Sequence, residues 1–204
     1  MFKDREEAGR VLVCLLKKMD IDTKNAIILA LPRGGVPVAC MIKKALNVPM
    51  DIVISKKIGA PYNPEYAIGA MSEWGDVEIN VYEEYDRDYI EQQRKEIKKK
   101  IEEYIQKYRQ GRKLPSIQGK EVILVDDGIA TGLTMLSVIN SLKKKKPKRI
   151  IVAVPVAPPE VVEKFEKIVE IVVVEKPDFF MAIGSFYEDF HQLTDEEVIE
   201  YLNA

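Results

Sequence analysis

The sequence predicts an α/β fold in which helices flank a mostly parallel, twisted sheet. The first observation is a set of short apolar runs, rich in β-branched residues, that have the length of buried strands. The second is that helical patterns separate these runs, and such alternation is typical of parallel strands joined by crossover helices. The runs predicted as strands are residues 26–31, 51–54, 122–125, 150–154 and 171–174.

The composition is that of a soluble globular protein, since 47% of the 204 residues are hydrophobic and 31% are charged. A chain of this length can form one well-packed domain, so we expect a single domain over residues 1–204. The net charge of −2 gives no electrostatic reason to expect a nucleic acid or a membrane as partner. No apolar run reaches the length of a membrane span, and Met1–Glu7 is too charged for a signal peptide, so we expect a cytoplasmic protein.

The two cysteines, Cys14 and Cys40, lie in the apolar helical stretches 3–19 and 36–46. Their spacing is not that of metal ligands, so we interpret both as reduced thiols in the core. The helix expected at 36–46 joins the first two strands, which implies a parallel pair with a right-handed crossover.

Residues 55–82 interrupt the alternation, because glycines and prolines recur through this segment. They predict a long irregular or hairpin-like excursion, closed by a short strand around Val77–Val81. A loop of that length inside a compact domain is usually functional. Residues 83–112 then carry apolar side chains at helical spacing among balanced charges, which predicts a long amphipathic helix. Its apolar stripe either packs on the domain or seals the interface of a homodimer.

The C-terminal part continues the alternation, with helices expected at 133–145 and 159–165. A last short helix is expected after Thr194, because Glu197 is placed for a capping box. The lysine run 143–146 falls at the end of the first of these helices, where cations complement the helix dipole. We therefore interpret the run as a solvated cap and not as a binding patch.

The stretch Val122–Thr134, which reads VILVDDGIATGLT, carries the clearest functional signal. Asp126 and Asp127 come directly after a buried strand, at the edge where open α/β sheets bind their ligands. The glycines of the loop that follows let the backbone approach a ligand, and the start of the next helix supplies N–H groups for an anion. Carboxylates beside an anion cradle suit a ligand with both hydroxyls and a phosphate, and a ribose 5-phosphate is the simplest one.

This stretch resembles the phosphoribosyl pyrophosphate (PRPP) signature of the type I phosphoribosyltransferases. The segment DDGIATGLTM is similar to the adenine phosphoribosyltransferase form, and it departs from most members at Gly128, where they carry a branched apolar residue. The resemblance implies that Ala130–Thr134 hold the 5-phosphate. It also implies that the two acids hold the ribose hydroxyls, directly or through water bound to Mg²⁺. The residues implied in PRPP binding are Asp126, Asp127, Gly128, Ile129, Ala130, Thr131, Gly132, Leu133 and Thr134.

A second anion site is expected at Arg33, Gly34 and Gly35, between the first strand and its helix. The arginine offers a fixed fork of donors and the glycines free the backbone amides, although a glycine turn with an exposed arginine is the plain alternative. The segment LPRGGVPVA is similar to the pyrophosphate loop of the same family, in which some members carry a non-proline cis peptide. Lys57, after the strand at 51–54, is a further candidate for pyrophosphate, with solvent exposure of Lys56 and Lys57 as the alternative.

Two further regions fit the same resemblance. The segment KKIGAPYNPEYAIGA occupies the place of the family's flexible loop, and Glu65 and Glu73 are either acids that assist proton transfer or exposed loop carboxylates. The segment after the last strand, residues 175–204, resembles the hood, where an aromatic side chain stacks the base. Phe179 and Phe180 are the candidates for that stacking, with core filling as the alternative, and His191 is interpreted as structural.

The whole chain is similar to the predicted phosphoribosyltransferases of archaea and bacteria. The resemblance implies an enzyme that uses Mg²⁺, with Asp126, Asp127 and Arg33 as catalytic residues, and transfers the phosphoribosyl group of PRPP to a small nitrogen acceptor. Ala130 stands where the 6-oxopurine enzymes place an aspartate, which argues against hypoxanthine or guanine. A PRPP-sensing regulator without transfer activity is the alternative. An aspartyl-phosphate receiver domain would explain the two acids but not the Arg-Gly-Gly loop.

Overall fold

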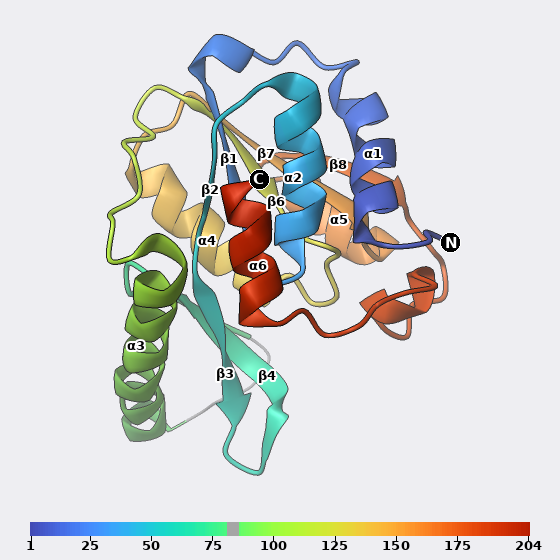
Figure 1. Ribbon diagram of the computed structural model, residues 1–204. Helices are drawn as coiled ribbons and strands as arrows, with labels where there is room; N and C mark the ends of the chain where they lie inside the picture. The colour runs from blue at the N-terminus through green and yellow to red at the C-terminus, as the bar shows by residue number, and fades with distance from the viewer. Residues whose placement is uncertain (81–85) are drawn as a thin grey trace. The chain divides into compact units, whose positions relative to one another are not determined.

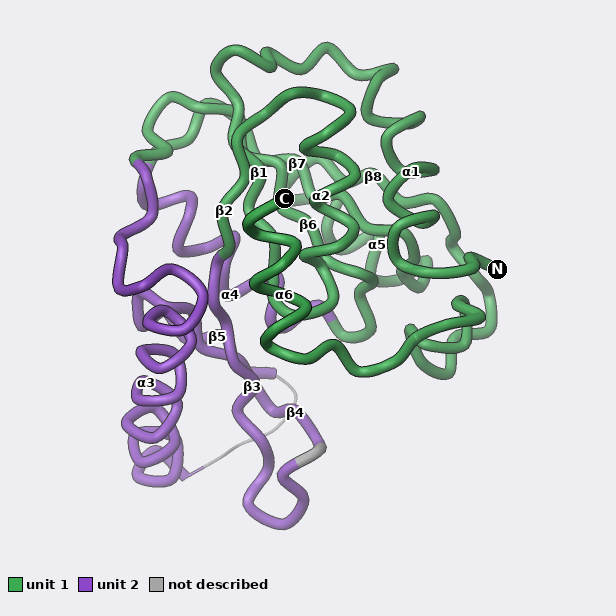
Figure 2. Tube along the Cα trace, viewed as in Figure 1, with its two compact units in different colours: residues 1–52, 116–131, 146–204 green, residues 53–115, 132–145 purple. Residues whose placement is uncertain are grey.

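The computed structural model describes residues 1–80 and 86–204, apart from the side chain of Glu65. The chain forms two compact units. Unit 1 comprises Met1–Ile52, Ser116–Thr131 and Lys146–Ala204, and unit 2 comprises Val53–Pro115 and Gly132–Lys145 (Figure 2).

Unit 1 is built on a five-stranded sheet with the order β2-β1-β6-β7-β8, in which every neighbouring pair is parallel. All residues of β1 and β6 are buried, because helices cover such sheets and their strands read as continuous apolar runs. The predicted parallel α/β fold is therefore confirmed. The strands are β1 (Ala26–Ala30), β2 (Met50–Ile52), β6 (Glu121–Val125), β7 (Arg149–Val156) and β8 (Glu170–Glu175).

The helices of unit 1 are α1 (Arg5–Leu16), α2 (Gly35–Leu46), α5 (Pro159–Glu166) and α6 (Asp195–Asn203). Helix α1 packs beside α2, and α6 packs on α2 (Figure 1). The capping box predicted at Thr194 and Glu197 is present at the start of α6. Two short 3₁₀ helices, η1 (Thr23–Asn25) and η2 (Ile183–Phe186), complete the unit.

Strands β1 and β6 define the place where a ligand is expected. From β1 the chain passes to β2 on one side of the sheet, and β6 lies on the other side. The strand order therefore reverses between β1 and β6, and open α/β sheets bind ligands at such switch points, outside the carboxyl ends of the strands. Ala30 is paired with Val125, and the Leu31 amide donates to the Val125 carbonyl over 2.9 Å. The loops that leave these two strands thus begin side by side.

Unit 2 contains the excursion and the long helix. The excursion is a hairpin of β3 (Ser55–Ala60) and β4 (Asn63–Ser72), extended by β5 (Val77–Ile79) into a three-stranded antiparallel sheet. Helix α3 (Arg87–Arg109) packs on β3, and α4 (Leu133–Lys144) packs on all three strands. The predicted helix start at 83–85 lies outside the described residues, whereas its end is close to the prediction.

The apolar stripe of α3 packs within unit 2, since Ile97, Ile101 and Tyr108 are buried there. One prediction about the cysteines is wrong: Cys40 is buried but Cys14 is exposed, because it lies on the outer side of α1. The lysine run 143–146 is exposed, as a solvated cap would be. Among the described residues, no helix combines the length and the apolar character that crossing a bilayer requires.

Glu73 is not an exposed loop carboxylate. Its side chain is only 6% exposed, and its Oε1 accepts a 2.8 Å bond from Arg109 Nη2, a guanidinium that is itself 2% exposed. The other oxygen accepts a bond from the Ile54 amide. Glu73 therefore pairs with Arg109 in the interior of unit 2, so the expectation of an exposed loop carboxylate is wrong, and its part in proton transfer stays a prediction.

Candidate functional site

The acid pair lies at the carboxyl end of β6, where the sequence places it. Asp126 is half-buried, and its Oδ1 accepts a 2.8 Å bond from the amide of Asp127. Asp127 is buried, at 8% exposure. The two neighbouring carboxylates thus have different surroundings, since one is half-buried and the other is buried.

The Arg-Gly-Gly loop that leaves β1 lies directly against the acid pair. A Cβ atom at Gly34 would fall 1.8 Å from Asp127 Oδ2, and one at Gly35 would fall 2.7 Å from the Val125 carbonyl and 2.9 Å from Asp126 Cα. Gly34 has right-handed helical dihedrals, φ −61° and ψ −33°, which any residue can adopt. Glycine is therefore required at these positions for close approach. The two sites that the sequence predicts separately are in contact.

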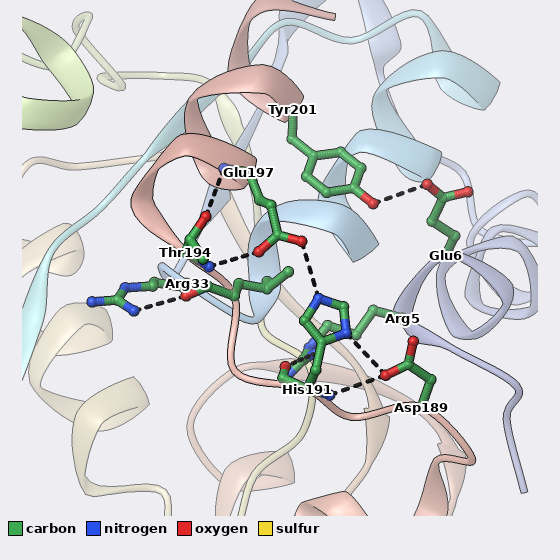
Figure 3. A network of polar contacts seen from close by, with 9 residues as sticks. Arg5, Glu6, Arg33, Asp189, His191, Thr194, Glu197 and Tyr201 are labelled. Carbon is green, nitrogen blue, oxygen red and sulfur yellow. Dashed lines mark hydrogen bonds and ion pairs between the residues drawn. The ribbon is translucent and has the colours of Figure 1, made fainter.

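Arg33 is held by the C-terminal segment. The peptide bond that precedes it, Pro32–Arg33, is cis. Arg33 Nη1 donates to the Leu193 carbonyl over 2.7 Å, a bond drawn in Figure 3. Its Nε lies 3.3 Å from Asp195 Oδ1, at the start of α6. The sequence predicts the arginine but not these partners.

Asp127 is held by two residues that the sequence patterns do not reveal. Arg5 Nε donates to Asp127 Oδ2 over 2.8 Å, and the Tyr187 hydroxyl donates to the Asp127 carbonyl over 2.6 Å. Burial raises the pKa of the Tyr187 hydroxyl well above its usual range, which keeps it protonated as a donor. These partners are 122 and 60 residues away in the chain, so no local pattern announces them.

The electrostatics of the acid pair follow from burial. Loss of water raises the pKa of the Asp126 carboxyl well above its usual range, and the charge of Asp127 raises it further. Burial also raises the pKa of Asp127, but the Arg5 guanidinium opposes that shift. A cation or several hydroxyl donors placed beside Asp126 would favour its charged form.

The loop after the acids has a backbone hydrogen bond to β7 at one residue and exposed residues directly after it. The Ile129 amide donates to the Val156 carbonyl over 2.9 Å, while Ala130 and Thr131 are exposed. A Cβ at Gly128 would fall 2.7 Å from a methyl carbon of Ile183, so the hood side chain fills the space that a branched residue would need. Gly132, at φ 79°, precedes α4 and no side chain caps that helix.

The remaining predicted residues lie in different settings. Lys56 and Lys57 are inside β3 and not at the end of a strand, with Lys57 exposed and the Lys56 ammonium 3.4 Å from the centre of the Tyr104 ring. Phe179 is 79% exposed, whereas Phe180 stacks on Phe186 with ring centres 5.5 Å apart.

His191 lies at the surface of unit 1. Its ring contacts the carboxylates of Asp189 and Glu197, and these bonds raise its pKa (Figure 3). This setting agrees with the structural interpretation.

The residues present fit a magnesium ion bound partly by its ligand. In the described part of the chain, no three or more His, Cys, Asp or Glu side chains gather in a way that could hold a metal. Asp126 and Asp127 supply two carboxylates, which do not by themselves complete the coordination of a metal ion. Mg²⁺ usually keeps several waters and binds through one or two carboxylates plus substrate phosphates, which matches this donor set.

Known proteins resemble the chain in sequence. A family model described as phosphoribosyl transferase domain matches residues 14–191. In two strains of Mycobacterium tuberculosis, a protein that carries the provisional name phosphoribosyl transferase is 35% identical over 208 residues. That match covers 100% of this chain and 46% of the relative, so the chain spans about half the length of the curated relatives it matches.

Solved structures resemble it in fold. The crystal structure of TT1426 from Thermus thermophilus has a TM-score of 0.83 and 37% identity, over 98% of this chain and 97% of that one. The structure of AQ2163 from Aquifex aeolicus has a TM-score of 0.51 and 17% identity, over 83% of this chain and 73% of that one, and indicates the fold alone.

Proposed function

The chain belongs to the phosphoribosyl transferase domain family, and from that premise we propose that it transfers the 5-phosphoribosyl group of PRPP to a nitrogen acceptor and releases pyrophosphate. The observation that carries the proposal is the contact between Gly34 and Asp127. It joins a loop suited to pyrophosphate with acids suited to ribose hydroxyls, and PRPP carries both groups on one sugar.

Each part of the site takes one part of the ligand in this proposal. Asp126 and Asp127 bind the ribose hydroxyls, directly or through water on Mg²⁺, and the exposed loop from Ala130 to the uncapped start of α4 binds the 5-phosphate. Arg33 and the amides of its glycines bind the pyrophosphate. Lys57 is proposed as a further pyrophosphate ligand.

The reaction breaks the bond from C1 of the ribose to pyrophosphate and forms a bond from C1 to nitrogen. Positive charge develops on the sugar as the pyrophosphate leaves. The chain's own residues hold the sugar in place, neutralise the leaving group and fix both in reacting geometry. When bound, Mg²⁺ supplies positive charge to the dense array of phosphate oxygens.

The acceptor is proposed to be a nitrogenous base or another small nitrogen compound. Ala130 has no group that could take a proton from a purine N7, which disfavours a 6-oxopurine enzyme that relies on that base. Phe179, with its exposed ring, is the better placed of the two aromatics to stack a planar acceptor, because Phe180 already stacks on Phe186.

A PRPP-sensing regulator is the second candidate, and one observation favours it. Arg33, the proposed pyrophosphate ligand, is already engaged by Leu193 and Asp195. Release of pyrophosphate from PRPP and Mg²⁺, measured with a panel of purines, pyrimidines and simple amines, separates the two. Binding of PRPP without turnover on any acceptor would support the regulator.

The binding proposal itself is tested by calorimetric titration of the chain with PRPP and Mg²⁺. We expect Asp126→Asn to lose most of the affinity while keeping its fold, because Asp126 is only half-buried. Asp20→Asn, an exposed acid of the same unit, is the matched control and should bind as the wild type does. Equal affinities in the two variants would refute the assignment of the acid pair.

A further inference from the structure

Arg5, the first residue of α1, is buried at 8% exposure and makes three contacts within unit 1. Its Nε donates to Asp127 Oδ2 over 2.8 Å, and its Nη1 donates to the His191 carbonyl over 3.0 Å, the latter drawn in Figure 3. Its guanidinium carbon lies 3.9 Å from the centre of the Phe190 ring. The guanidinium is thus fixed by two hydrogen bonds and one ring face.

Stability alone is a weak reason for such an arrangement. Burying an ion pair removes both charges from water, and well-packed apolar residues in its place are often as stable or more so. The planar fork of an arginine, however, fixes the direction of its partners in a way that an apolar side chain cannot. The buried Arg5 guanidinium is therefore suited to hold the Asp127 carboxylate in one orientation.

A second close approach also confines the Asp127 carboxylate. Gly34 approaches so closely that a Cβ there would lie 1.8 Å from the same Oδ2 that Arg5 binds. The backbone of Asp127 is bound by Tyr187, whose ring stacks on Phe190 with ring centres 4.9 Å apart. Arg5, Phe190, Tyr187 and Asp127 thus form a closed ring of contacts.

We propose that Arg5 is a positioning residue, which holds the Asp127 carboxylate in one orientation against the pyrophosphate loop and ties it to the C-terminal segment. The inference rests on the proposed function, since the orientation matters only if Asp127 binds PRPP. Arg5 acts through Asp127 and contacts no ligand in this role. Without it, the carboxylate is free to turn away from Gly34, and the C-terminal segment keeps its bond from Tyr187 to the Asp127 backbone but loses its link to the carboxylate.

The test is a double-mutant cycle on the affinity for PRPP with Mg²⁺, measured by calorimetry. Arg5→Met keeps the length of the side chain and removes its donors, and we expect affinity to fall about 10- to 100-fold, as for outer-shell partners in metal sites. Arg5→Lys keeps the charge but not the fork, so it should recover part of that loss. Arg10→Met, on the exposed side of the same helix, should bind as the wild type does.

The decisive comparison uses Asp127→Asn. If Arg5 acts through Asp127, Arg5→Met should change affinity less than about twofold in the Asp127→Asn background, because the group it positions is already altered. An equal loss in both backgrounds would mean a general structural role and would overturn the inference. Should Arg5→Met not fold, Arg5→Lys takes its place in the cycle with the same two outcomes.

The two proposals fail in different ways. Failure of the wild-type chain to bind PRPP would overturn the proposed function and the positioning inference with it. Binding by the wild type with an unchanged affinity in folded Arg5→Met would overturn the positioning inference alone.

Discussion

Replacing Gly34 by alanine tests the contact on which the site depends. The backbone at Gly34 is right-handed helical, so alanine adds no backbone strain and the whole effect comes from its methyl group. That methyl would lie 1.8 Å from Asp127 Oδ2, whereas ordinary van der Waals contact begins at 3.4 Å. Either the loop or the carboxylate must move by more than an ångström.

The neighbouring residues indicate which of the two moves. The loop is confined at Gly35, where a Cβ would meet the Val125 carbonyl at 2.7 Å, so we expect the carboxylate to be displaced. Overpacking alone costs about 1–3 kcal/mol. Losing the bond to Arg5 leaves a buried charge without its partner, which raises the cost to about 3–5 kcal/mol.

Urea unfolding at neutral pH and PRPP calorimetry measure the two consequences. Gly119→Ala is the control, because Gly119 is at φ +72° and a Cβ there would have nothing within 4 Å. There the cost is about 1–2 kcal/mol of backbone strain, with no effect on PRPP affinity. The reasoning is refuted if Gly34→Ala costs no more than Gly119→Ala and binds PRPP as the wild type does.

Three further predictions concern other groups. The pKa of Asp126 is raised in the folded chain, so the unfolding free energy of the chain falls as pH rises above 3.8, the ordinary pKa of this group. Asp126→Asn should therefore melt at a higher temperature than the wild type at pH 7, and melting curves should show this gain shrinking as pH is lowered towards 3.8. Arg109→Met should cost about 3–5 kcal/mol in urea unfolding because it removes the buried guanidinium that binds the Glu73 carboxylate, and adding Glu73→Gln should recover part of that cost, whereas simple additivity would contradict the pairing. Burial raises the pKa of Cys40 while Cys14 is exposed, so a thiol reagent should label Cys14 first in the native chain and both thiols after unfolding, as mass spectrometry of the labelled peptides would verify.

The strands and helices of unit 1 are predictable because their signals are local. An apolar run is buried on both faces in a parallel sheet, and each helix has its own periodicity. The hairpin is harder, because its glycines resemble loop breakers. A Cβ at Gly59 would fall 2.4 Å from the Pro64 carbonyl, and one at Gly69 would fall 2.5 Å from the Glu78 carbonyl. These glycines permit close approach between strands, which depends on pairing that the sequence does not display.

The residues of the site also divide into those that have a local sequence signal and those that do not. Asp126, Asp127 and Arg33 were predictable because each follows a strand at its carboxyl end, where the fold gathers ligand groups. Arg5, Tyr187 and Asp195 were not, since each contacts the site from a distant part of the chain. Arg5 stands at the start of a helix in an ordinary charged stretch, and only its burial reveals it.

Asp126 and Asp127 differ in how the protein stabilises their charges, and this difference affects how the site would hold its ligand. Burial raises the pKa of both carboxyls, yet Asp127 has a guanidinium at 2.8 Å that opposes the rise, whereas the charge of Asp127 adds to the rise in the pKa of Asp126. A bound cation or a pair of hydroxyl donors stabilises a charged carboxylate more when the protein itself supplies less stabilisation to that charge. Asp126 is therefore the carboxylate whose ionisation ligand binding should promote. Asp127, already compensated by Arg5, is suited to hold its carboxylate in a fixed position against Gly34.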